Sequence, residues 1–220
     1  MTLKSARLRL PVETSDLEPL EIGTVVYLDG IVYTGREGLY KKIDEGVMPP
    51  VDLASLGNAN FHCSPAASVG DDGTYNLGAV TATASFRFSR FLPKFFEISK
   101  AKLILGKGGM SEQDYRDHFV PNGAIYLTTV GYGTGALLGR GIKRVRDVHW
   151  LKELGIAQAV WVLEVENFGP FLVESDLRGR SLFEQSNRET LDGIERVYAG
   201  LKSPALRRYG ETVNRDDEVI

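Results

Sequence analysis

The sequence predicts an α/β domain built on a mixed β-sheet. Short runs rich in Val, Ile, Leu and aromatic residues alternate along the chain with segments that have the apolar spacing of helices. Gly and Pro residues separate these runs, as expected where strands and helices end. The predicted strands outnumber the predicted helices, so we expect a layered domain with one mixed sheet, or with two sheets.

The individual elements follow from local patterns. Residues 24–35 predict two strands around a tight turn at Asp29–Gly30. Residues 36–46 predict a helix that Gly46 can end, and residues 84–99 predict a second one that Pro93 must kink or break. Ser111 is a good N-cap for a third helix at 111–119. Further strands are expected at 60–65, 71–80, 101–109, 124–130, 143–150, 159–165 and 170–175.

The residue pattern changes near residue 186, from alternating strands and helices to one amphipathic segment with a charged end. Residues 188–201 can form an amphipathic helix, and the last residues are strongly charged. We therefore expect one domain at 1–185 and a helical tail at 186–220. The apolar face of the expected helix consists of Leu191, Ile194, Val197 and Leu201.

Composition and charge exclude several classes of protein. The net charge is −3 and no basic stripe is present, which argues against a nucleic-acid partner. The N-terminal residues lack the apolar core of a signal peptide, and no run approaches the roughly 20 apolar residues of a membrane span. Cys63 is the single cysteine, so no internal disulfide can form. We expect a cytoplasmic protein that binds neither membranes nor nucleic acid.

Three cationic side chains follow predicted strands: Arg36, Arg87 and Lys107. Strand ends are where α/β folds build binding sites. Arginine binds a carboxylate through two parallel hydrogen bonds, and lysine provides a compact point charge. Two arginines and a lysine therefore suit a small dianion such as a dicarboxylate. Each of the three could equally be an ordinary solvated surface charge, and Thr83, four residues before Arg87, could be only a helix cap.

Two other motifs have less specific patterns. Cys63 in the run His-Cys-Ser-Pro has no second cysteine near it, which favours a buried, unreactive thiol. Residues 131–136 fit the dinucleotide pattern G-x-G-x-x-A, with Glu153 further along the chain. Gly139 and Gly141, however, shorten the helix that such a loop requires. A nucleotide-binding protein is therefore a third possibility.

Four stretches together resemble a known family. They are GIVYTGRE (30–37), TASFR (83–87), LILGKGGM (103–110) and the run at 148–173. They resemble the β subunit, or C-terminal domain, of the class I iron–sulfur fumarases, and equally the L(+)-tartrate dehydratases of the same group. The resemblance covers roughly residues 15–180. Its most specific part is the order of an arginine, Thr-x-x-x-Arg, and the lysine of Gly-Lys-Gly.

The resemblance implies a fold, a cofactor and a partner. The fold would be a swivelling β/β/α layered domain with a mixed sheet, and residues 1–185 would form the hydro-lyase catalytic domain. The active enzyme would carry a [4Fe–4S] cluster held by three cysteines of a separate α subunit, in a heterotetramer. This chain has only Cys63, which is consistent with a cluster supplied by that partner.

The resemblance also assigns roles to four residues. Arg36 and Arg87 would bind substrate carboxylates, and Lys107 would meet the other end of the substrate. Thr83 would move the C3 proton. A threonine hydroxyl is a very poor base in water, so this role needs a hydrogen-bonded carboxylate beside it, from the α subunit.

The function implied first is the reversible hydration of fumarate to (S)-malate. The alternatives are an L(+)-tartrate dehydratase β subunit and a non-catalytic anion-binding module of the same fold. The sequence departs from the family pattern at Tyr40, where a histidine is usual, and at Ser64, where a glycine is usual. The stretch GAVTATAS at 78–85 also departs, so Thr81 competes with Thr83 for the proton-transfer position.

Overall fold

The structure is a computed structural model that describes residues 4–131, 133–197 and 199–200. The chain separates into two compact units, with the division between Gln185 and Ser186. No helix among the described residues is long and apolar enough to cross a membrane.

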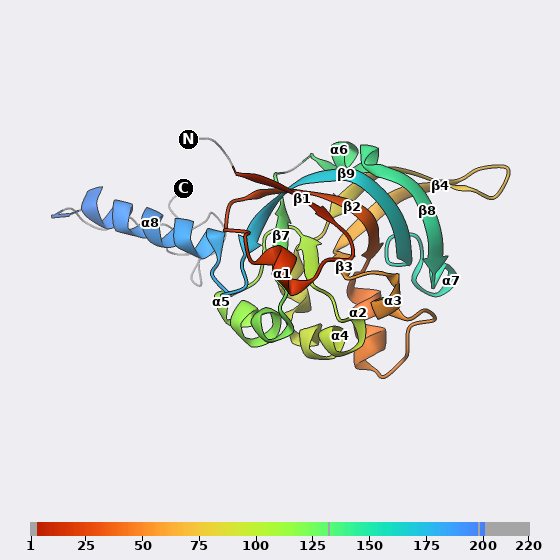
Figure 1. The fold of residues 1–220 in the computed structure, drawn as a ribbon, viewed down its shortest axis with the longest axis horizontal. Helices are drawn as coiled ribbons and strands as arrows, with labels where there is room; N and C mark the ends of the chain where they lie inside the picture. The colour runs from red at the N-terminus through yellow and green to blue at the C-terminus, as the bar shows by residue number, and fades with distance from the viewer. Residues whose placement is uncertain (1–3, 132, 198, 201–220) are drawn as a thin grey trace, which may run out of the picture. The chain divides into compact units, whose positions relative to one another are not determined.

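A β-barrel forms the centre of the first unit (Figure 1). The seven-stranded sheet has the order β1-β2-β3-β6-β7-β9-β8, and β2 also pairs with β9. This extra pairing closes β2, β3, β6, β7 and β9 into a five-stranded ring, so the layered sheet expected from the sequence curls into a barrel. The strands are β1 (Ser5–Arg9), β2 (Val25–Thr34), β3 (Ala59–Phe61), β6 (Leu103–Gly106), β7 (Ile125–Thr129), β8 (Ile142–His149) and β9 (Val160–Ser175).

The sheet is mixed, as predicted. Strands β2, β3, β6 and β7 run parallel to one another, and β9 runs antiparallel to both β2 and β7. The carboxyl ends of the four parallel strands therefore lie at one end of the barrel. We call this end the C-terminal mouth; it is formed by the residues that follow Thr34, Phe61, Gly106 and Thr128.

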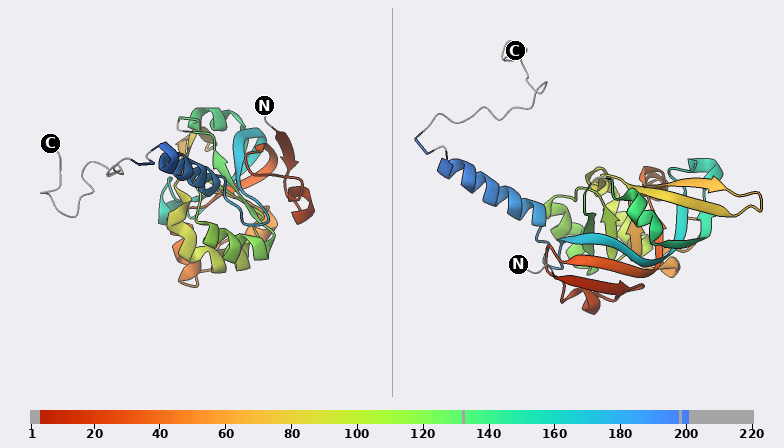
Figure 2. Two further views of the ribbon diagram at one scale, coloured as in Figure 1. Left: turned by 90° about the vertical axis from the view of Figure 1, so that its left-hand side faces the viewer. Right: turned by 90° about the horizontal axis from the view of Figure 1, so that it is seen from above.

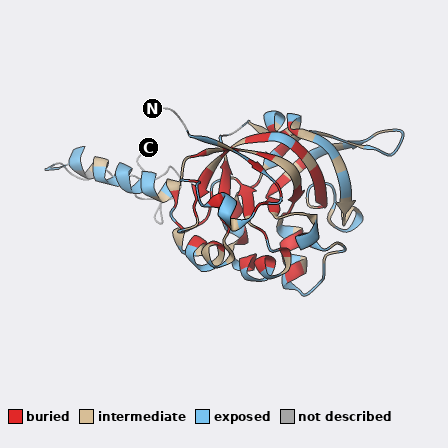
Figure 3. Ribbon diagram, in the orientation of Figure 1, coloured by how far each residue is buried: buried red, intermediate tan, exposed pale blue. Residues whose placement is uncertain are grey.

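Alternating side chains divide the apolar residues between two cores. One core fills the barrel and includes Val32, Phe61, Leu105 and Leu127. The other lies between the outer face of the barrel and the helices, where aromatic side chains dominate. Figure 3 shows both cores as buried ribbon segments. The helical elements are α1 (Thr14–Leu17), α2 (Glu37–Asp44), α3 (Leu53–Leu56), η1 (Ser85–Phe91), α4 (Leu92–Ser99), α5 (Glu112–Asp114), η2 (Tyr115–Phe119), η3 (Val120–Asn122), α6 (Gly135–Arg140) and α7 (Leu151–Leu154).

A two-stranded hairpin, β4 (Cys63–Val69) and β5 (Tyr75–Ala82), extends from the barrel (Figure 2). Helix α6 packs closely on β5, because a Cβ at Gly139 would lie only 2.0 Å from the Gly78 carbonyl oxygen. Gly135 also lies near β5, since a Cβ there would lie 2.8 Å from the Val80 carbonyl oxygen, so both glycines of α6 serve a close backbone approach.

Two predictions of strand breaks are wrong. Residues 24–35 form the single strand β2, because Gly30 takes φ +120° and a register shift against β9 absorbs the bend. Residues 159–165 and 170–175 are likewise one strand, β9, which continues through a bend at Gly169. The predicted Pro93 break is confirmed, since η1 ends where α4 begins. The Ser111 N-cap is also confirmed.

Helix α8 (Leu182–Val197) begins just before the second unit and continues into it. The helix begins six residues before the start predicted at residue 188, and Leu191 and Val197 of the predicted apolar face are exposed on it. Leu201, the last position of the predicted apolar face, lies outside the described residues.

Candidate functional site

Arg36 and Lys107 extend two inward-facing rows of side chains at the C-terminal mouth. Val32 lies in the barrel core, and Arg36 follows it by four residues along an extended backbone (φ −134°, ψ −170° at Arg36). Leu105 lies in the same core, and Lys107 follows it by two residues. Because side chains alternate in extended backbone, both cations fall on the face that lines the barrel. The strand ends thus bring two of the predicted cations to one mouth.

The guanidinium of Arg36 is held by neutral groups. Its Nη1 donates hydrogen bonds to the Ser64 hydroxyl and to the Ala157 carbonyl oxygen, the latter at 3.2 Å. Its Nε is buried and has no acceptor among the described residues. In the described part of the chain, no carboxylate forms an ion pair with Arg36. A buried guanidinium N–H without an acceptor is costly, so an anionic ligand would stabilise this arrangement.

Thr83 lies between two strand ends. Its N–H donates to the His62 carbonyl oxygen at 2.7 Å, and its carbonyl oxygen accepts from the Lys107 N–H at 3.1 Å. The Ser85 N–H then donates to the Lys107 carbonyl oxygen at 3.2 Å. The segment 83–85 therefore lengthens the sheet beside Lys107. Thr83 is buried, whereas Thr81 is exposed.

Arg87 is exposed in η1, with its Cζ 5.8 Å from the centre of the Phe88 ring. The pKa of Glu37 is lowered, mainly by its hydrogen bond with Lys41, and further by the positive charges of Arg87 and Arg90. Glu37 directly follows Arg36, so Arg87 lies within electrostatic range of that part of the mouth.

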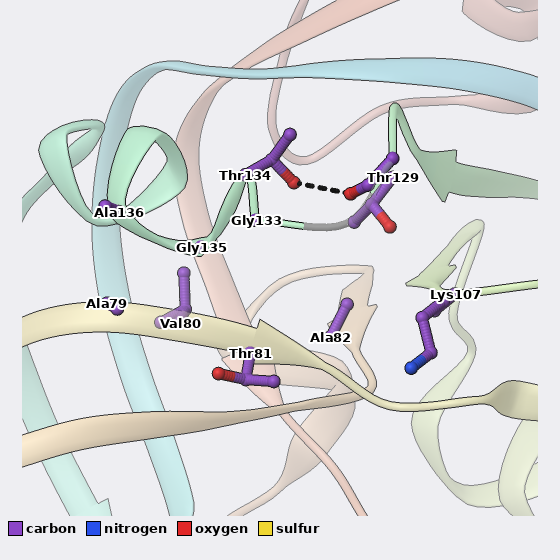
Figure 4. Close-up of a pocket in the computed structure, with 11 residues that line it drawn as sticks. Ala79, Val80, Thr81, Ala82, Lys107, Thr129, Gly133, Thr134, Gly135 and Ala136 are labelled. Atoms are coloured by element: carbon purple, nitrogen blue, oxygen red, sulfur yellow. Dashed lines mark hydrogen bonds between the residues drawn. The ribbon is translucent and has the colours of Figure 1, made fainter.

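An open pocket of about 340 Å³ borders Lys107 (Figure 4). Thr129 of β7 lines the same pocket, and the register pair Gly106–Thr128 puts Thr129 beside Lys107 on the same face. Thr81 also lines it, but Arg36, Thr83 and Arg87 do not. The remaining walls come from residues 79–82 of β5 and from Gly131 and residues 133–136.

Thr129 was not among the residues singled out from the sequence. Its hydroxyl makes no hydrogen bond within the described part of the chain. Strand alternation could have identified Thr129. Ile125, Leu127 and Thr129 are every second residue of β7, and the first two fill the barrel core. Extending that row by one position identifies a hydroxyl at the mouth.

The first two glycines of the dinucleotide motif, Gly131 and Gly133, take positive φ values, and a Cβ at either would meet nothing within 4 Å. The helix after these glycines, α6, has only six residues, and its glycines face the backbone of β5. Thr134 uses its hydroxyl within the loop, donating to the Gly131 carbonyl oxygen at 3.1 Å (Figure 4). The Cys63 thiol is buried, and burial raises its pKa, so the thiol stays protonated and unreactive.

A comparison with protein families identifies the family of this chain. The family described as "Fumarase C-terminus" matches residues 2–186. The chain belongs to the fumarase C-terminus family. The resemblance seen in the sequence is thereby confirmed.

Curated relatives of the fumarase C-terminus family fall into two kinds. The "Putative L(+)-tartrate dehydratase subunit beta" of Methanocaldococcus jannaschii is 33% identical over 186 residues, covering 83% of this chain and 93% of that protein. The "L(+)-tartrate dehydratase subunit beta" of Escherichia coli K12 is 30% identical, covering 82% and 88%. The "Putative fumarate hydratase class I" of Geobacillus stearothermophilus is 30% identical, covering 85% of this chain but 35% of that protein.

The residues of this family member do not fit an iron–sulfur cluster. Such clusters are held by several cysteine thiolates. The sequence has one cysteine, Cys63, and it is buried. No group of three or more His, Cys, Asp or Glu side chains that could hold a metal occurs among the described residues.

A buried acid lies behind the Gly-Lys-Gly-Gly turn. The Glu174 carboxyl accepts hydrogen bonds from the Tyr115 hydroxyl and, at 2.5 Å, from the Ser181 hydroxyl. A Cβ at Gly109 would lie 3.1 Å from its carboxyl carbon. Burial raises the pKa of Glu174 to about 7, although these hydrogen bonds oppose the shift.

Replacing Glu174 with glutamine should change how stability depends on pH. The folded-state pKa of about 7 lies above the unfolded value of 4.5, so the stabilisation that Glu174 contributes is lost as pH rises from 5 to 7. The expected loss is about 2 kcal/mol. The glutamine amide has no such proton to lose. The free energy of unfolding of E174Q minus that of wild type should therefore rise by about 2 kcal/mol over this window, measured by denaturant titration.

His62 changes the stability in the opposite direction from Glu174 between pH 5 and 7. Burial lowers its pKa to about 3 from 6.5, so protonation of the unfolded state destabilises the protein as pH falls below 6.5. This contributes about 2 kcal/mol of added stability from pH 5 to 7, which offsets the Glu174 effect. A difference between E174Q and wild type that stays constant with pH would contradict the protonation assigned to Glu174.

Proposed function

We propose that the chain is the β subunit of a hydro-lyase that adds or removes water on a small C4 dicarboxylate, and that L(+)-tartrate is its first candidate substrate. Membership of the fumarase C-terminus family supports the hydro-lyase assignment. The relatives of similar length carry tartrate dehydratase names, which favours tartrate over the fumarate preferred from the sequence. Fumarate and (S)-malate are the second candidates.

The observation that carries this proposal is the buried, unpaired Nε–H of Arg36 at the same mouth as Lys107. A carboxylate would accept from Arg36 and be attracted by the ammonium of Lys107. Arg36 and Arg87 would hold one carboxylate, and Lys107 the other. The neutral Ser64 and Ala157 groups would fix the orientation of Arg36 without cancelling its charge.

Thr83 would move the proton at C3 of the substrate, with Thr81 as its competitor for that role. The backbone of Thr83 is fixed on both sides, by His62 and by Lys107, so its position relative to the substrate would be well defined. A neutral hydroxyl needs a neighbouring carboxylate to accept its proton. The proposed partner would supply that carboxylate.

The proposed partner is an α subunit that holds the [4Fe–4S] cluster, in a heterotetramer with this chain. The name "subunit beta" of the relatives and the lack of cluster ligands among the described residues both support it. Residues 1–185 would form the catalytic domain, of the swivelling β/β/α type, and residues 186–220 a helical tail.

Thr129 would recognise the second hydroxyl that distinguishes tartrate from malate. Replacing Thr129 with valine keeps the shape and removes the hydroxyl. We expect kcat/KM for tartrate to fall about tenfold and that for malate to change little, because one neutral hydrogen bond is lost. Steady-state kinetics with both substrates would measure this. Equal losses for the two substrates would remove Thr129 from hydroxyl recognition.

The experiment that tests the function compares the lone chain with the chain co-expressed with the proposed α subunit, which is to be sought in the neighbouring reading frame. Purified without oxygen, each is assayed with L(+)-tartrate, fumarate and (S)-malate. The proposal expects an inactive lone chain and an active, oxygen-sensitive complex. Complex formation without turnover of any of these substrates would favour the non-catalytic anion-binding module. NAD(P) binding to the lone chain would favour the nucleotide alternative.

A further inference from the structure

Five buried polar side chains form one continuous hydrogen-bonded chain behind the candidate site. The Tyr40 hydroxyl donates to the Asn60 amide oxygen at 3.1 Å and lies 2.6 Å from His62 Nε2. His62 Nδ1 lies 2.7 Å from the Ser85 hydroxyl, which lies 2.6 Å from the Tyr126 hydroxyl. All five side chains are fully buried.

Both ends of this chain bind backbone groups. The Asn60 amide donates to the Tyr33 carbonyl oxygen at 3.3 Å, and the Gly109 N–H hydrogen-bonds to the Tyr126 hydroxyl. Tyr40 belongs to α2, the helix that Arg36 caps, and Gly109 belongs to the turn that carries Lys107. Ser85 belongs to the segment of Thr83 and Arg87. This hydrogen-bonded chain therefore contacts each element that carries a candidate site residue.

The available donors and acceptors fix which group donates in each hydrogen bond of this chain. Tyr40 has a single hydroxyl proton, and it is committed to Asn60, so His62 Nε2 must donate to the Tyr40 oxygen. His62 is neutral, because burial lowers its pKa to about 3, so Nδ1 is then an acceptor. Ser85 consequently donates to His62, and Tyr126 donates to Ser85. Every group in the chain is satisfied in this arrangement, and His62 has only its Nε2–H tautomer.

We propose that His62 is a positioning residue, which through Tyr40, Ser85 and Tyr126 fixes α2, the 83–87 segment and the Gly-Lys-Gly-Gly turn relative to one another. His62 touches no substrate in this account; it acts through the elements that carry Arg36, Thr83 and Lys107. His62 lies at the end of the neighbouring strand and contacts Tyr40 from there. This role rests on the proposed function, whereas the tautomer does not.

The tautomer is tested on the full chain alone, labelled with ¹⁵N-histidine. The protein has three histidines, and the variant H62F identifies which NMR signals belong to His62. We expect a protonated Nε2 and an unprotonated Nδ1 for His62, unchanged down to about pH 5. The opposite tautomer, or protonation near the ordinary pKa of histidine, would overturn the proposed chain.

The positioning role is tested in the α–β complex with S85A and Y126F, which each remove one hydroxyl from the chain. We expect kcat/KM to fall about tenfold or more, because small displacements of binding groups are amplified in rate. The control is Y33F, which removes a buried tyrosine hydroxyl outside the chain. If the hydroxyls are merely structural, S85A, Y126F and Y33F should all have lower melting temperatures and similar kcat/KM values. That result would overturn the proposal. An inactive wild-type complex would instead refute the proposed function and leave the tautomer result standing.

Discussion

Replacing Thr83 with valine is expected to lower kcat of the assembled enzyme by about 10² to 10⁴-fold with little change in KM. A positioned group that transfers a proton contributes an acceleration of this size. Valine keeps the branched shape of threonine, so the backbone hydrogen bonds of residue 83 to His62 and Lys107 should persist. Steady-state kinetics of T83V with the preferred dicarboxylate measures the loss.

The matched control is T81V, two residues earlier on the same stretch of chain. Thr81 is exposed and lines the pocket with Lys107, whereas Thr83 is buried and does not. We expect T81V to retain activity within a few fold. If T81V loses kcat and T83V does not, the proton-transfer position belongs to Thr81.

Replacing Lys107 with alanine should lower kcat/KM about 100-fold or more. A charge-assisted contact between an ammonium and a carboxylate would stabilise the complex by ~3 kcal/mol if the proposed α subunit closes the open pocket at Lys107 off from water. The loss should appear for every dicarboxylate substrate, because Lys107 would recognise the carboxylate that they share. Kinetics of K107A with tartrate and malate would measure it.

Lys94 offers a control for the removal of a lysine. It is exposed on α4, where it pairs with Asp44 at 3.4 Å, so K94A should leave kcat/KM unchanged. Surface ion pairs of this kind contribute little to stability. Unchanged kinetics in K107A as well would remove Lys107 from substrate binding.

Part of the site could be predicted from local sequence because it lies at strand ends. Arg36 and Lys107 each follow a strand that is recognisable in the sequence as a short apolar run, so their place at a strand end could be predicted. Strand alternation identifies Thr129 once β7 is known to neighbour β6. The pairing of β6 with β7 joins segments that are distant in the sequence. The alternation within β7 alone therefore did not reveal the pocket that Thr129 and Lys107 share.

The buried hydrogen-bonded chain was not predicted because its members are far apart in sequence. Tyr40, Ser85 and Tyr126 come from three elements, and His62 connects β3 to β4. Only the packing of α2 and η1 against the barrel brings these four side chains together. His62 stands beside Cys63 in the sequence, and nothing in that local run indicates the partners of its imidazole. Closure of the barrel also escaped prediction, because it depends on the single long strand β9, which Gly169 suggested was two.

The most direct test is a crystal structure of the α–β complex with a bound dicarboxylate that is not turned over. The account predicts one carboxylate accepting a hydrogen bond from Arg36 Nε and the other within hydrogen-bond distance of Lys107 Nζ. A dicarboxylate bound with neither residue in contact, while the complex is catalytically active, would contradict the assignment of the barrel mouth as the substrate site.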